Sequence, residues 1–431
     1  MGFLGDEAQG KARIRSRGSP EMRVRNKNKV SISSTAAVAA VTLSVFYYPL
    51  RFAFGTYEYV YYIIISMILA AFMICHWPSK SIQLAGVLFF CIYMSVVSII
   101  GVFYSQNVLH ISQIVIYFVI PVAFFASGYI VNRDFLRRSL VAILVVFFVF
   151  TVIERAEFWL GLDFPGFVEF SAAMKSAALS YGIDPSYGRA TGLFINPNQL
   201  GFFAGAILFS ILSIKSNIEN RDLAAIFMMA VVLMLLSGSR GSMFAFAVAV
   251  LVYILVSRSF RILPALAGTA LLVFVGYLYV GANAAGSLEV FMDRLLYGST
   301  DQNDSMVGRL TFWSSVFQNV NLLTGTLIPP EMYLQHAIDS FYVRTLAQGG
   351  VLGLLSALIL FLSQFVGANR LAPAKARGAF LALLTFVMVN SFSMLGLLDL
   401  QAVFVWIIMG LVAERLELGS VRRTGGRPNA S

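Results

Sequence analysis

Arg189 precedes a predicted helix start and opens the segment Arg-Ala-Thr-Gly-Leu-Phe-Ile-Asn-Pro-Asn at 189–198. Asn196 or Asn198 suits the N-cap of that helix, and Pro197 marks the turn before it. A helix N-terminus offers unpaired backbone N–H groups and a positive dipole end, so an anion there would be bound by these amides and by Arg189 together. A simple capped helix entry is the alternative interpretation.

Arg240 lies in a second segment of interest, Ser-Gly-Ser-Arg-Gly-Ser at 237–242. This segment joins two apolar spans through a turn so short that Arg240 must lie at the outer membrane surface or just inside it. An arginine near hydrocarbon is costly unless it snorkels to the surface or finds a partner, so it is a candidate for function. Gly238 and Gly241 would let an anionic ligand approach the backbone closely.

A third group of residues follows in the segment Gly-Arg-Leu-Thr-Phe-Trp at 308–313 and in the run from His336 to Arg344. His336 and Asp339 are three residues apart, so on a helix they share a face. A carboxylate beside an imidazole can orient it and raise its basicity, as a general base acting on a hydroxyl group requires. The alternative is an ordinary surface pair.

The elements that must position these residues are membrane helices. The chain of 431 residues is 58% hydrophobic and only 12% charged, with a mean hydropathy of +0.80, whereas an ordinary soluble domain has about a quarter charged residues. We therefore expect an all-α polytopic bundle of about twelve transmembrane helices. The predicted spans are 32–53, 57–75, 82–103, 110–131, 138–160, 199–214, 222–237, 241–257, 262–283, 346–367, 376–395 and 398–414.

Lysine and arginine alternate between the two sides of these spans, which predicts the orientation. The N-terminal tail, the cluster Arg133/Arg137/Arg138, the connections near 215–221, 258–261 and 370–377, and the C-terminal tail hold most of the cations. The other side holds only Arg155, Lys175, Arg189, Arg240, Arg294, Arg309 and Arg344, plus Arg51 near a helix end. Both termini are therefore predicted to be cytoplasmic. The net charge of +10 is then mostly an orientation signal, supplemented by contact with anionic membrane lipid, and not the mark of a nucleic-acid partner.

Two long connections on the predicted outer side complete the domain organisation. The chain divides into a basic disordered tail (1–31), N-terminal spans (32–160), a first periplasmic loop (161–198), central spans (199–283), a large periplasmic loop (284–345), C-terminal spans (346–414) and a cytoplasmic tail (415–431). Two cysteines and three histidines without metal-ligand spacing predict neither a disulfide framework nor a zinc site.

In their order along the chain, these motifs resemble the bacterial O-antigen ligase and polymerase superfamily, the WaaL and Wzy proteins. The match runs from 189–198 through Ser-Arg-Gly at 239–241 and Gly-Arg-x-x-x-Trp at 308–313 to the segment His336–Gly353. It covers about residues 185–365, and outside this region only the hydrophobic spans are similar.

The resemblance implies a GT-C-like glycosyltransferase of the bacterial inner membrane, acting at the periplasmic face on glycans carried by undecaprenyl pyrophosphate. Transfer would be inverting and would need neither a metal nor another cofactor. Arginines would hold the pyrophosphate leaving group while a base deprotonates the acceptor hydroxyl. The implied partners are the lipid-linked glycan and membrane lipid, with chain-length regulator and flippase proteins as candidates. The implied residues are Arg189, Arg240 and Arg309 for pyrophosphate, with Arg344 in reserve, His336 and Asp339 for catalysis, and Asn196, Asn198, Ser239 and Tyr342 in support.

The last motif departs from the ligases, which tend to read His-Asn before the tyrosine. Aligned on Tyr342, this chain has Asp339-Ser340 in that place, with His336 one helical turn earlier, and Gln348 replaces the usual glutamate. The departure favours a polymerase that joins repeat units of O-antigen or exopolysaccharide over a ligase that transfers finished polymer to lipid A core. Whether Asp339 accepts the proton itself or orients His336 stays open.

A membrane transporter is the rival from another class. It would need ionisable residues deep in the spans or helices broken by glycine or proline near mid-bilayer. Pro121 and Asp399 are the main candidates for such features in the sequence. A purely structural scaffold would not explain arginines on the side that the orientation depletes of them.

Overall fold

The structure is a computed structural model of the whole chain. It describes residues 34–54, 81–105, 114–160, 164, 172, 176, 189–214, 218–260, 262–264, 267–268, 311, 313–318, 320–323, 325, 340–371, 373–398 and 402–424.

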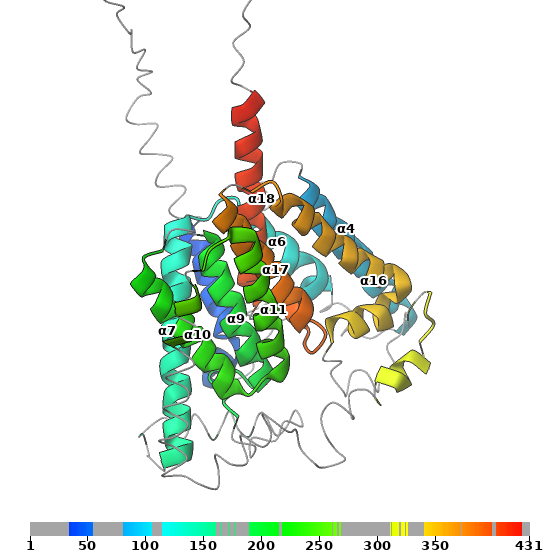
Figure 1. Cartoon of the computed structure of the whole chain (residues 1–431). Coiled ribbons are helices and arrows are strands. Elements are labelled where there is room, and N and C mark those ends of the chain that lie inside the picture. The colour runs from blue at the N-terminus through cyan, green and yellow to red at the C-terminus, as the bar shows by residue number, and fades with distance from the viewer. Residues whose placement is uncertain are drawn as a thin grey trace, which may run out of the picture.

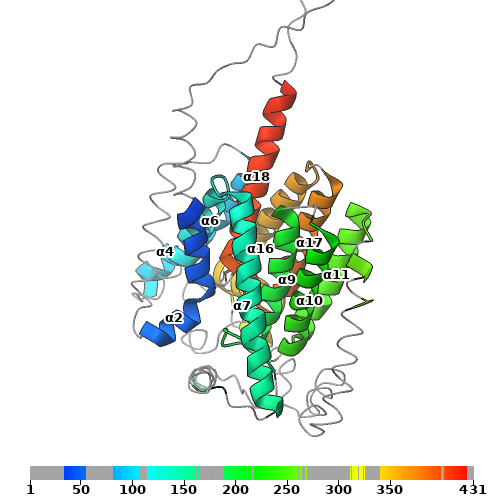
Figure 2. The ribbon, with the colours of Figure 1, turned by 90° about the vertical axis from the view of Figure 1, so that its left-hand side faces the viewer.

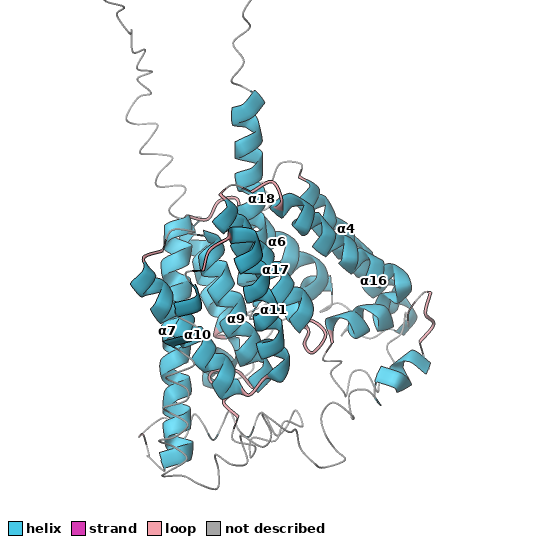
Figure 3. Ribbon diagram, viewed as in Figure 1, coloured by secondary structure: helices cyan, strands magenta, loops and turns pink. Residues whose placement is uncertain are grey.

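These residues form helices joined by turns, and Figure 3 draws no strand among them. The helical elements are Ser34–Val45, α2 (Tyr47–Phe54), α4 (Ile82–Ser105), η1 (Val115–Val119), α6 (Ile120–Ser127), α7 (Arg133–Leu160), α9 (Pro197–Ile214), α10 (Asn220–Ser237), α11 (Arg240–Ser257), α16 (Phe341–Ala368), α17 (Ala374–Asn390), η3 (Gly396–Leu398) and α18 (Val403–Thr424).

Six of the described helices are long and apolar enough to cross a membrane. They are α4, α7, α9, α10, α11 and α16, and Ser34–Val45 and Val115–Ser127 are shorter apolar helices. The prediction of a helical membrane protein is therefore confirmed. The predicted span at 57–75 and most of that at 262–283 lie outside the described residues, so the total of twelve spans stays a prediction.

The bundle is built around α9, whose residues are buried almost along its whole length. Because α9 is apolar on all sides, it is suited to the centre of a bundle. It packs against α17 and α10, while α11 packs closely on α17 and α18 on α6. Phe203 of α9 contacts Phe147 of α7 and Phe404 of α18. In Figure 2, α7 runs along the outside of this bundle.

The pair formed by α4 and α16 lies to one side of the other helices (Figure 1). Phe90 of α4 packs on Tyr117 of η1 and on Phe341 of α16. This aromatic contact connects the pair to the rest of the bundle. The outer surfaces of both helices expose large apolar side chains, such as Phe89 at 50% and Leu362 at 60%, as expected for helices that face lipid.

The cation-rich helix ends that alternation assigns to one side do lie together. Arg133, the first residue of α7, forms an ion pair of 2.9 Å with Glu414 of α18. Arg415 donates to the carbonyl of Ser213 at the end of α9 (2.9 Å). We call this the basic end of the bundle. The side of the membrane on which it lies stays a prediction.

Helix α16 differs from its predicted span in two respects. It begins at Phe341, before the predicted start at 346, so Arg344 belongs to the helix and not to the loop. It is also broken in its interior, where Gly350 has φ 62° and ψ −161°. Residues 320–323 pack against this break: the Val351 amide donates to the Leu322 carbonyl at 2.8 Å.

Gly350→Ala is expected to lower the free energy of unfolding by about 2 kcal/mol, because its backbone conformation is essentially restricted to glycine. The added Cβ would also collide with the carbonyl group of Leu323. The measurement is the thermal midpoint of the purified protein in detergent. Gly268→Ala is the control, since a Cβ there meets nothing within 4 Å; equal midpoints for the two variants would contradict the expected strain.

Candidate functional site

Two of the predicted motifs meet where α9 and α11 begin and α10 ends. The turn between α10 and α11 consists of Gly238 and Ser239, as short as the sequence predicts. Gly201 of α9 faces this turn, and a Cβ on it would lie 2.8 Å from the Ser239 Cβ and 2.9 Å from the Ser242 Oγ. The absence of a side chain at Gly201 therefore allows α9 to approach the Ser-Arg-Gly turn closely. We call this the site end of the bundle.

Arg189 connects α9 to α10 at the site end. Its Nε donates to the Ser237 carbonyl at 2.8 Å, and its Nη2 donates to the Asn198 Oδ1 at 2.7 Å. The next residue, Ala190, donates its amide to the Leu236 carbonyl at 2.9 Å. The guanidinium is thus held in a fixed place between two helix ends.

The two asparagines of the Asn-Pro-Asn motif have different tasks. Asn196 is the N-cap, because its Oδ1 accepts the Asn198 amide at 2.9 Å and Pro197 is the first residue of α9. Asn198 instead accepts the bond from Arg189. Since Asn196 already satisfies one amide of the helix N-terminus, an anion bound there would depend more on the arginine than the sequence analysis assumed.

Arg240 is the first residue of α11, and its side chain is exposed. The turn that carries it is fixed by α17. Ser239 caps α11 through the Ser242 amide (3.4 Å), and the Asn390 side chain of α17 donates to the Ser242 Oγ at 2.9 Å. Gly241 lies against the side chain of Ser393, which follows α17. Arg240 thus has a rigid support and an accessible head group.

The start of α16 joins the same end of α17. Ser340 is its N-cap, and the Phe341 amide donates to the carbonyls of Ser391 (3.0 Å) and Met394 (2.9 Å). The Tyr342 hydroxyl donates to the Met388 carbonyl at 2.9 Å. These contacts place the start of α16 at the site end, and Tyr342 anchors it there.

Arg344 lies on the η1 side of α16. Its guanidinium carbon is 6.0 Å from the centre of the Tyr117 ring, at the outer limit for a cation–π contact. The Tyr117 hydroxyl in turn donates to the Gln348 side chain. Tyr117 sits in a five-residue π-helical segment, a type of irregularity that often marks a functional site.

Three predicted residues, Arg309, His336 and Asp339, lie outside the described residues. Described residues follow Arg309 from residue 311 on, and Ser340 directly follows Asp339. Val316 and Val320 pack on Val343 and Ala347 of α16, so a segment just after Arg309 lies against the half of α16 that carries Arg344. Ser340, the residue after Asp339, is buried at the start of that helix.

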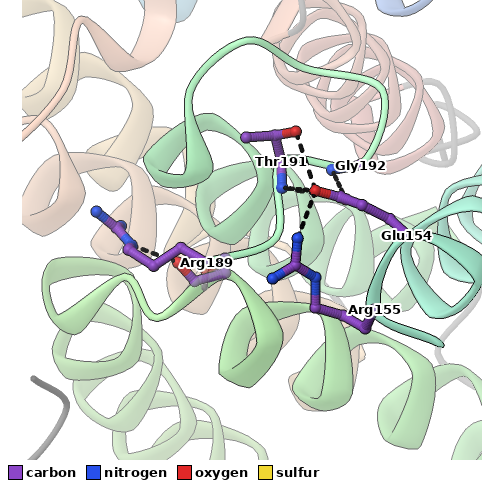
Figure 4. Close-up of polar contacts among 6 residues, drawn as sticks. Glu154, Arg155, Arg189, Thr191 and Gly192 are labelled. Carbon is purple, nitrogen blue, oxygen red and sulfur yellow. Dashed lines mark hydrogen bonds and ion pairs between the residues drawn. The ribbon is translucent and has the colours of Figure 1, made fainter. Parts of the chain in front are cut away.

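Glu154 is a residue of the site end that the sequence analysis missed (Figure 4). Its buried carboxylate accepts hydrogen bonds from Arg155, from both amides of Thr191 and Gly192, and from the Thr191 hydroxyl. Arg155, one of the few cations predicted for the outer side, is 4% exposed and paired with Glu154. Adjacent opposite charges within an apolar span are the signal that could have found this pair.

Three described arginines of this region are candidates for anion binding. Arg189 lies in the loop before α9, Arg240 is the first residue of α11, and Arg344 lies in the first turn of α16. Guanidinium groups suit phosphate because their N–H donors bind two oxygens at once. Among the described residues, no group of three or more His, Cys, Asp or Glu side chains gathers that could hold a metal ion.

The chain matches no known family model and no curated protein.

Proposed function

We propose that the protein is a GT-C-like glycosyltransferase of the bacterial inner membrane that polymerises oligosaccharide repeat units carried on undecaprenyl pyrophosphate. The observation that carries the proposal is that Arg189, Arg240 and Arg344 lie in segments next to the helix starts at the end opposite the basic end of the bundle. In the orientation that alternation predicts, the basic end and both termini are cytoplasmic and these arginines face the periplasm.

The chemistry follows from the charges. A hydroxyl of the acceptor sugar attacks the anomeric carbon of the donor, the bond from that carbon to the pyrophosphate oxygen breaks, and undecaprenyl pyrophosphate leaves. Its developing negative charge would be stabilised by Arg189, Arg240 and Arg309, with Arg344 in reserve. Asp339 would accept the hydroxyl proton, or would orient His336 to do so.

Glycan profiling of a deletion strain tests this proposal. Single repeat units on the lipid carrier or on lipid A core, in place of polymer, are the result expected for a polymerase. Polymer that accumulates on the lipid carrier and never reaches lipid A core would instead assign the protein as a ligase. A normal profile would count against both activities.

A second candidate, a membrane transporter, is favoured by one observation. The structure has a helix broken at Gly350 beside the π-helical segment that precedes Pro121. Discontinuous helices of this kind form substrate sites in many transporters. Flux of a labelled amphipathic solute into proteoliposomes that lack lipid-linked glycan would support the transporter, and its absence together with glycan transfer would support the polymerase.

A further inference from the structure

We infer that Glu154 is a positioning residue: its buried carboxylate fixes the loop 189–192 and so holds Arg189 in place for the pyrophosphate. For its activity readout the inference rests on the proposed function. The geometry behind the inference does not depend on that function. It consists of the contacts among Glu154, Arg155, Thr191 and Gly192 (Figure 4).

The carboxylate of Glu154 accepts bonds from four donor groups. Oε1 is 2.9 Å from the Arg155 Nη2, 3.1 Å from the Thr191 amide nitrogen and 3.3 Å from the Thr191 hydroxyl. Oε2 is 2.7 Å from the amide nitrogen of Gly192, which has φ 59°. Two successive amides that point at one anion form a backbone nest. The protein's own carboxylate therefore occupies this nest and determines the conformation of the loop.

Packing contacts, in addition to this carboxylate, also position the loop against α7. Phe147, Thr151 and Glu154 are spaced by four and three residues, so they share one face of α7. The Phe147 ring packs on Phe194, with centroids 4.7 Å apart, and a Cβ on Gly192 would lie 2.8 Å from the Thr151 hydroxyl oxygen. This face of α7 thus contacts the loop at successive positions.

The other side of the loop is bound to α10. Ala190 and Arg189 both donate to carbonyls at the end of α10, and Arg189 also bonds Asn198 of α9. The backbone from 189 to 192 is therefore held by hydrogen bonds on two sides, to α10 and to the Glu154 carboxylate. If that carboxylate is lost, the α7 side of the loop is released. The Arg189 guanidinium is then held only by its bonds to Ser237 and Asn198, and its backbone can shift relative to α7.

Neutralising the charge of Arg155 does not by itself explain the hydrogen bonds that the Glu154 carboxylate accepts. Glu154 and Arg155 are 7% and 4% exposed, and each provides the other with a buried counter-charge. A carboxylate that served only as a counter-ion would not need to accept two amides and a hydroxyl as well. A glutamine side chain has one acceptor oxygen and would present an NH₂ group to the remaining donors, so it cannot replace the carboxylate here.

The test compares Glu154→Gln, Arg189→Ala and the charge-balanced double variant Glu154→Gln/Arg155→Gln. Glycan transfer is measured with purified protein and a synthetic lipid-linked repeat unit. Because small misplacements of a positioned group can lower rates about a hundredfold, we expect kcat to fall by about tenfold to a hundredfold in Glu154→Gln, with KM little changed. The double variant should stay equally slow. Adding Glu154→Gln to Arg189→Ala should lower kcat no further.

Two outcomes would overturn the inference. Recovery of wild-type kcat in the double variant would mean that Glu154 acts only as a counter-ion to Arg155. Independent, multiplying losses from Glu154→Gln and Arg189→Ala would mean that Glu154 does not act through Arg189.

Hydrogen exchange of the amides of Thr191 and Gly192 separates this inference from the proposed function. Both amides should exchange faster in Glu154→Gln and in Glu154→Gln/Arg155→Gln, and should stay protected in Arg189→Ala. If the wild-type protein transfers no glycan, the proposed function fails, yet this exchange pattern still supports the role of Glu154. Unchanged protection in both carboxylate variants would refute that role whatever the activity.

Discussion

Arg240→Ala is expected to abolish polymer formation, with a fall of about 10²–10³-fold in the transfer rate, while the protein still inserts in the membrane. Removing one preorganised donor from a developing oxyanion has an effect of this size in other enzymes. Arg240 is exposed at the first turn of α11, and Ser239, Ser242 and Asn390 fix the backbone beneath it. Its loss should therefore remove charge from the site without disturbing the packing. The measurements are the glycan profile of the complemented deletion strain and the rate with purified protein.

Arg370→Ala is the matched control for this prediction. Arg370 is also an exposed arginine, but it lies between the end of α16 and the start of α17, away from the site end. It should retain wild-type activity. The sequence motif predicts the same loss for Arg309→Ala as for Arg240→Ala. Wild-type polymer in both of these variants would remove the basis for an arginine clamp.

The parts of the site that the sequence predicts are those that depend on local chemistry. An asparagine before Pro197 and a two-residue connection between apolar runs leave the chain few options, so the start of α9 and the turn before Arg240 follow directly from the residues. The cation-rich helix ends are predicted to lie on one side because each span takes the chain across the membrane, so that every second connection returns to the same side. These features need no knowledge of which helices are neighbours.

The features that the sequence analysis missed depend on contacts between distant segments. The Gly349-Gly350 pair lies in an apolar run that fits an unbroken span, and the break becomes apparent only with residues 320–323 packed against it. In the sequence, Glu154 and Arg155 are simply one negative and one positive charge near a predicted helix end. Their role depends on a loop that lies 37 and 38 residues further along the chain. Hydropathy reports burial in the membrane, but it does not report which backbone amides a carboxylate will meet.

Gly410→Leu is expected to destabilise the protein by about 3 kcal/mol or more, because α6 and α18 touch through their backbones at this point. A Cβ on Gly410 would collide with the Phe125 carbonyl oxygen, and one on Gly128 would collide with the Ile407 carbonyl oxygen. Small residues that let helices approach closely are a main source of association energy in membranes, and forcing extra atoms into packed helices costs 1–3 kcal/mol or more. The thermal midpoint in detergent measures the effect, with Gly268→Leu as the control, since a Cβ there meets nothing within 4 Å. Equal midpoints for the two variants would show that α18 is free to move away from α6, and the close crossing of these helices would then not be needed to hold the bundle together.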